Sequence, residues 1–137
     1  MNKKLIALLT LVFALAALAL AATATAGSPH FIQSAFTTST SGNTLTVTGK
    51  EAGLGDETQI HVTLSATALC INGGGNHPKA NNKTSVTASG DFPVQNGKAD
   101  FSLSGTAVFQ PDCVPPMTVS FTDITITDTT NNLVAHL

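Results

Sequence analysis

Apolar and polar residues alternate along much of the chain after residue 27, a period typical of strands that bury one face. The alternation is clearest over residues 58–70, where one face carries Ile60, Val62, Leu64, Ala66 and Ala68. Cys70 is in phase with this set, so its side chain is expected to point inward. No stretch after residue 27 shows the 3.6-residue period of an amphipathic helix. The pattern predicts an all-β domain.

Two turn signals predict hairpins. Asn96-Gly97 suits a two-residue turn with positive φ at both positions, and it would pair Phe92 with Phe101 in register. The same register pairs Val86 with Ala107, so we expect residues 86–107 to form a single antiparallel ladder. Pro93 lacks an amide donor and indicates an edge strand or a bulge.

A second hairpin is expected between residues 31–40 and 44–48, around Gly42-Asn43. In residues 117–128 the apolar phase changes, which a β-bulge near Thr122-Asp123 would explain. A short strand at residues 133–137 completes the set. About seven antiparallel strands at regular spacing predict an immunoglobulin-like β-sandwich of two sheets.

The first 26 residues have the features of a secretory signal peptide. Lys3 and Lys4 form the positive start, residues 5–22 are apolar apart from Thr10, and residues 24–26 (Ala-Thr-Ala) match a cleavage site. An uncleaved membrane anchor is the alternative. We expect cleavage, which leaves residues 27–137 as a single domain that is secreted and extracellular and has no membrane attachment.

Charge and composition exclude several classes of partner. After cleavage the chain keeps four lysines and no arginine against all eight carboxylates, a formal charge of −4. Nucleic-acid binding needs a basic surface, which this chain does not have. Trp and Tyr are absent, which disfavours a carbohydrate-binding surface built on stacking. We expect a monomer with an extracellular or cell-surface partner of unknown identity.

Two cysteines in an exported domain predict one disulfide, Cys70–Cys113. The predicted strand order supports the pairing, because the loops that carry the two cysteines emerge at the same end of a sandwich. A metal-binding or nucleophilic cysteine is the alternative.

The segment 71–83 is the strongest candidate for a binding surface in the chain; the alternative, which long loops of this composition favour, is a simple connection. Its Gly-rich sequence lacks the Gly-Lys-Ser/Thr of a phosphate-binding loop. The disulfide would hold it near residues 110–116. The candidate binding residues are Asn76, His77, Lys79, Asn81, Asn82 and Asp112.

No pattern predicts a catalytic residue, a metal site or a cofactor. His30, His61, His77 and His136 are scattered without ligand spacing, and His61 falls on the polar face of its strand. The carboxylates around residues 51–57 are a weak candidate for calcium, because they lack the spacing of a calcium loop. No G-x-S-x-G sequence is present, and we expect a protein that is not an enzyme.

Four segments carry a resemblance to known proteins: residues 50–57, 72–79, 91–98 and 110–117. Together they resemble small exported proteins of Gram-positive soil bacteria, especially actinomycetes. The resemblance implies export and a bacterial source but no activity. The sequence therefore favours a secreted, non-catalytic binding or structural domain; the alternatives are a carrier of a small apolar ligand and an extracellular enzyme.

Overall fold

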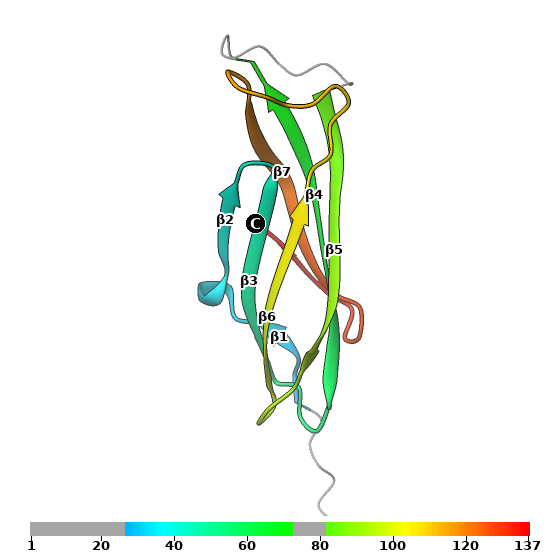
Figure 1. Cartoon of the computed structure of the whole chain (residues 1–137). Helices are drawn as coiled ribbons and strands as arrows, with labels where there is room; N and C mark the ends of the chain where they lie inside the picture. The colour runs from blue at the N-terminus through cyan, green and yellow to red at the C-terminus, as the bar shows by residue number, and fades with distance from the viewer. Residues whose placement is uncertain (1–26, 73–81) are drawn as a thin grey trace, which may run out of the picture.

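Two antiparallel sheets make up the domain in the computed structural model, which describes residues 27–72 and 82–137. Sheet A contains β1 (His30–Phe31), β2 (Thr37–Ser41), β3 (Thr44–Ala52) and β6 (Lys98–Thr106). Sheet B has the order β5-β4-β7-β8 and contains β5 (Lys83–Pro93), β4 (Gln59–Ile71), β7 (Thr118–Asp128) and β8 (Leu133–His136). Figure 1 shows the long strands running along the molecule in two layers. The predicted β-sandwich is confirmed. Within the described residues, no helix is long and apolar enough to cross a membrane.

The first predicted strand is divided in two. A 3-10 turn over Gln33–Ala35 separates β1 from β2, and both strands pair with the same side of β3. This division gives eight strands instead of seven. The hairpin around Gly42 is confirmed, since Ser41 pairs with Thr44 and Gly42 has a φ of 56°.

The predicted ladder around Asn96-Gly97 is wrong, although the turn itself is present. Asn96 and Gly97 have φ values of 52° and 70°, as the turn type requires. Beyond the isolated bridge between Gln95 and Lys98, the chain crosses from one sheet to the other. Strand β5 pairs with β4 in sheet B, whereas β6 pairs with β3 in sheet A.

The residues that we expected to pair in this ladder meet instead as side chains across the core. The rings of Phe92 and Phe101 have centroids 6.0 Å apart, although their strands belong to different sheets. A side chain on Gly105 would likewise collide with Val86. Alternation shows which face of a strand is buried, but it does not distinguish a neighbour within one sheet from a residue on the opposite sheet.

Two finer predictions are confirmed. The register between β4 and β7 shifts after Ser65, and Asp123 has a φ of 53°, so the bulge lies where the apolar phase changes. Pro93 ends β5, which is an edge strand of sheet B.

The outer face of sheet A is lined by hydroxyl groups. Thr44 and Thr106 are 2.9 Å apart between their Oγ1 atoms, and Thr46 Oγ1 lies 2.7 Å from Ser104 Oγ. These pairs come from β3 and β6, which are neighbours in the sheet. Side-chain hydroxyls are therefore the main polar groups on this face, and ionic groups are few.

Gly49 on β3 is required by the aromatic side chains that pack over it. A Cβ at this position would lie 2.9 Å from Phe36 Cε1 and closer still to the ring of Phe101. The ring of Phe101 also contacts those of Phe31 and Phe92, so it has little room to move. We expect Gly49→Ala to lower the free energy of unfolding by about 1–3 kcal/mol, measured by chemical denaturation. Ser39→Ala on the exposed strand β2 is the control and should change it by less than about 0.5 kcal/mol; equal effects of the two changes would contradict the argument.

Candidate functional site: the disulfide-bonded end

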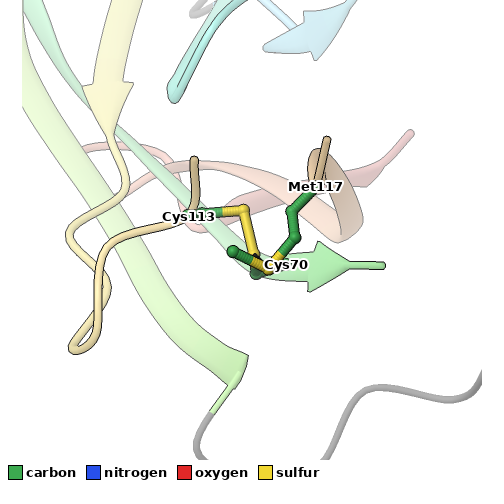
Figure 2. The surroundings of a disulfide bond; sticks show 3 residues. All are labelled: Cys70, Cys113 and Met117. Carbon is green, nitrogen blue, oxygen red and sulfur yellow. Dashed lines mark hydrogen bonds between the residues drawn. A yellow bond between two sulfur atoms is a disulfide. The ribbon is translucent and has the colours of Figure 1, made fainter. Parts of the chain in front are cut away.

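Cys70 and Cys113 form a disulfide with a Cα–Cα distance of 5.7 Å, which confirms the predicted bond. Cys70 lies near the end of β4, and Cys113 lies in the β6–β7 connection, residues 107–117. Met117 Sδ is 3.6 Å from Cys70 Sγ, so a third sulfur packs against the bond (Figure 2). We call this part of the sandwich the disulfide end.

Beyond the last residues of β6, the β6–β7 connection replaces that strand in covering sheet B. In Figure 1 it rises past the β2–β3 hairpin, alongside the ends of β4, β5 and β7. Ala107 and Phe109 are buried in the core, and the amide of Ala107 donates to Asn43 O over 2.8 Å. Cys113 and Met117 also pack against the core. One side of the connection is therefore anchored by packing and by the disulfide.

The other side of this connection exposes apolar groups to solvent. Val108 is 69 % exposed and Val114 is 53 % exposed. Exposed prolines flank them at positions 111, 115 and 116. The connection is therefore anchored on one side and carries exposed aliphatic side chains on the other.

The structure places only two of the candidate binding residues. Asn82 is half-buried directly before β5, and Asp112 is exposed in the β6–β7 connection. The start of β5 lies at the disulfide end, because Lys83 pairs with Leu69 beside Cys70. The remaining four, Asn76, His77, Lys79 and Asn81, lie outside the described residues. The apolar face formed by Val108 and Val114 was not identified from the sequence, although two valines among three prolines were a visible signal.

A histidine–carboxylate pair lies on the outer face of sheet B. His61 Nδ1 is 2.7 Å from Asp91 Oδ1, and the two residues are direct cross-strand neighbours on β4 and β5. Both side chains are largely exposed. In the described part of the chain, no hydroxyl bonds to the other ring nitrogen of His61, so the pair lacks the nucleophile of a catalytic triad. His61 is a surface residue, as its place on the polar face predicted.

An open hollow of about 420 Å³ lies where the chain crosses from β5 to β6. Its polar lining includes Lys50 and Lys98, and Lys50 Nζ is 3.0 Å from Asp100 Oδ1. This ion pair is exposed and belongs to a solvated surface.

Two carboxyl groups are fully buried, which the sequence analysis did not foresee. Glu51 on β3 and Asp128 at the end of β7 both have 0 % exposed surface. The signal was the alternation itself, because Glu51 follows Leu45 and Val47 at even spacing and Asp128 follows Ile126. Glu51 was expected to flank a loop as a weak calcium candidate; it belongs to β3 and is buried in the core instead.

The environment of Glu51 favours its neutral form. Burial, reinforced by the negative charge of Asp128, raises the pKa of the Glu51 carboxyl to about 8. Among residues 27–72 and 82–137, no group of three His, Cys, Asp or Glu side chains is arranged to hold a metal ion. The weak calcium candidate around residues 51–57 therefore gains no ligand set from the described residues.

A comparison of the chain with protein-family models, with curated proteins and with solved structures found no match.

Proposed function

We propose that the protein is a secreted, non-catalytic binding domain whose contact surface is the disulfide end. The observation that carries the proposal is that the β6–β7 connection is buried on one side and exposed on the other. Phe109 and the disulfide anchor its inner side, while Val108 and Val114 are exposed on its outer side. A surface that is already ordered loses little conformational entropy when a partner binds.

The chemistry of this surface favours a protein partner. Exposed valine and proline side chains offer aliphatic contact area with few rotatable bonds, and they suit the apolar centre of a protein–protein interface. The formal charge of −4 expected for residues 27–137 disfavours anionic partners such as nucleic acid. The partner would be met outside the cell, in keeping with the expected signal peptide and with the disulfide.

We infer an immunoglobulin-like topology from the strand order, counting β1 and β2 as one strand. In an antibody constant domain the fourth strand joins the sheet of the first, second and fifth. Here the corresponding strand, β5, pairs with β4 in the other sheet. The inferred arrangement is thus a variant of the immunoglobulin fold in which a sheet of three strands faces a sheet of four. Such sandwiches present their loops at the two ends, which fits a contact surface at the disulfide end.

The alternatives receive less support. A carrier of an apolar ligand needs space between the sheets, and in the described residues the two facing layers meet through fully buried side chains such as Leu45, Val62 and Ile126. An extracellular enzyme needs a nucleophile or an acid–base pair at a cleft, and the His61–Asp91 pair lies on an exposed strand face.

The binding proposal is tested by making the exposed valines polar. Val108→Ser with Val114→Ser should reduce binding of the purified domain to cells of the organism that encodes it by about tenfold or more, because each valine loses apolar contact. Binding is measured with fluorescently labelled protein over a concentration series.

Val134→Ser is the matched control. Val134 is 56 % exposed on β8 and lies beside Thr127, far along β7 from the residue that faces Cys70. It should leave binding unchanged, and circular dichroism should show that all variants remain folded. Binding that is insensitive to the Val108 and Val114 changes, or equally sensitive to Val134→Ser, would exclude the disulfide end as the contact surface.

A further inference from the structure

Glu51 and Asp128 are fully buried, one on each sheet, and Asp128 is among the groups that raise the pKa of Glu51, so the two carboxyl groups face each other across the core at a place remote from the disulfide. Glu51 belongs to sheet A, where it pairs with Phe31 of β1 and with Ala99 of β6. Asp128 belongs to sheet B, where it pairs with Val62 of β4. Cys70 lies eight positions further along β4 than Val62, so the two features occupy different ends of the strand.

Asp128 and Glu51 differ in the hydrogen bonds that their carboxyl oxygens accept. Asp128 Oδ1 accepts from the amide of Thr130 over 2.7 Å, and Asp128 Oδ2 accepts from Asn131 Nδ2 over 2.8 Å. As a carboxylate, Glu51 would have no donor at either oxygen among the described residues. An ionised, unpartnered and fully buried carboxylate is among the most costly groups that a protein can contain.

No cationic side chain of the described residues compensates this charge. The neighbouring strands present Phe31 and Ala99, which carry no charge. The β3–β4 loop contributes Glu57, whose negative charge also opposes ionisation of Glu51. The β7–β8 turn contributes Asn131, whose amide donates to both Asp128 and Glu57. Every titratable group that acts on Glu51 here is therefore acidic.

A proton fits this place better than a metal ion. The NH₂ group of Asn131 already donates to Asp128 and Glu57, 2.8 Å and 3.1 Å from their oxygens, and among the described residues no three His, Cys, Asp or Glu side chains are arranged to hold a metal ion. A proton on Glu51 needs no additional space, and it turns an oxygen without a partner into a donor to Asp128.

We propose that Glu51 and Asp128 share one proton, which Glu51 donates as a hydrogen bond to Asp128, and that this pair is a pH-sensitive latch between the two sheets. The proton bridges sheet A and sheet B in neutral and acidic surroundings. Its loss in alkaline surroundings leaves two buried negative charges facing each other, which loosens β1 and β3 from sheet B. The latch is independent of the contact surface at the disulfide end.

The direction of the pH dependence follows from the raised pKa of Glu51. Its ordinary value is 4.5 and its value in the folded protein is about 8. Below about pH 4.5 the group is protonated in both the folded and the unfolded state, so its stabilising effect is fully present. Between about pH 4.5 and 8 only the folded state keeps the proton, and stability falls as the pH rises. Above about pH 8 this dependence ends.

Chemical denaturation between pH 4 and pH 9 tests the latch. In the wild-type protein the unfolding equilibrium constant should rise by up to tenfold for each pH unit between about pH 5 and 8, because one proton is released on unfolding. Glu51→Gln keeps the shape and a donor without the titration, so this rise should be lost. The control Glu57→Gln removes a half-buried carboxyl and should keep it. A wild-type protein without the rise, or a Glu51→Gln variant that retains it, would overturn the proposal.

Two further measurements keep the test decisive if Glu51→Gln folds poorly. The ¹³C chemical shift of the Glu51 carboxyl in the wild-type protein should titrate near pH 8, and titration near pH 4.5 would overturn the proposal. Calcium or magnesium chloride should not change the denaturation midpoint at pH 8. A rise of that midpoint in the wild-type protein and not in the Glu51→Gln variant would replace the shared proton by a cation site.

Discussion

Replacing both Cys70 and Cys113 by alanine is expected to lower the free energy of unfolding by about 4 kcal/mol. The disulfide closes a loop of 43 residues, and in the chain-entropy model it stabilises the fold by restricting the unfolded chain to that extent. For a domain of this size such a loss is a large share of the total stability. Chemical denaturation of the oxidised wild-type protein and the double variant at the same pH measures it.

The structure also predicts where the double variant loosens first. The β6–β7 connection depends on the disulfide and on Phe109 for its anchoring, whereas β3 and β6 are held by a continuous ladder. Hydrogen exchange should therefore accelerate most in residues 107–117. The wild-type protein treated with a reductant serves as a second comparison and should match the double variant. A loss below about 1 kcal/mol would show that packing alone holds the connection.

Phe101→Ala is expected to cost about 3–5 kcal/mol, the usual range for truncating a buried aromatic side chain. Phe101 is 3 % exposed, and its ring centroid lies 6.0 Å from those of Phe31, Phe36 and Phe92. These partners come from both sheets and from the segment between β1 and β2. Removal of the ring therefore leaves a cavity at the point where three parts of the chain meet.

Phe36→Ala is the matched control for this prediction. Phe36 belongs to the same aromatic cluster but is only partly buried, so its truncation should cost clearly less than that of Phe101. Thermal or chemical denaturation of both variants gives the comparison. Similar losses for the two would mean that the cluster does not centre on Phe101.

For the candidate site, the sequence predicted the disulfide and the segment 110–116 beside it, but it did not single out the exposed valines. Cys70 could be placed because it is in phase with the buried face of its strand, and the expected export made its pairing with Cys113 the simplest interpretation. The exposure of Val108 and Val114 could not be predicted in the same way, because a loop has no period that assigns its side chains to an inner or an outer face. It depends on how the connection is anchored, with Phe109 in the core and Cys113 in the disulfide.

The buried acidic pair, Glu51 and Asp128, is a second feature that the sequence alone did not predict. The sequence placed Glu51 beside a loop as a weak calcium candidate, whereas β3 extends to Ala52 and buries it. Its burial in the assembled sandwich, together with the approach of Asp128 from the second sheet, shows why this position favours a neutral carboxyl.

The sequence by itself determined the local features: the strands, their inward faces, the turn at Asn96-Gly97, the bulge in β7 and the disulfide. These follow from period-two alternation, from residues that accept positive φ and from the pairing of two cysteines in a chain that is expected to be exported, all of which act over a few residues or on a single pair. Apart from the hairpin around Gly42, the tertiary structure alone decided which strand lies beside which. The segments joined by the Asn96-Gly97 turn satisfy the same pattern whether their apolar faces meet within one sheet or across two. The choice between these arrangements depends on burying every apolar face of the domain at once.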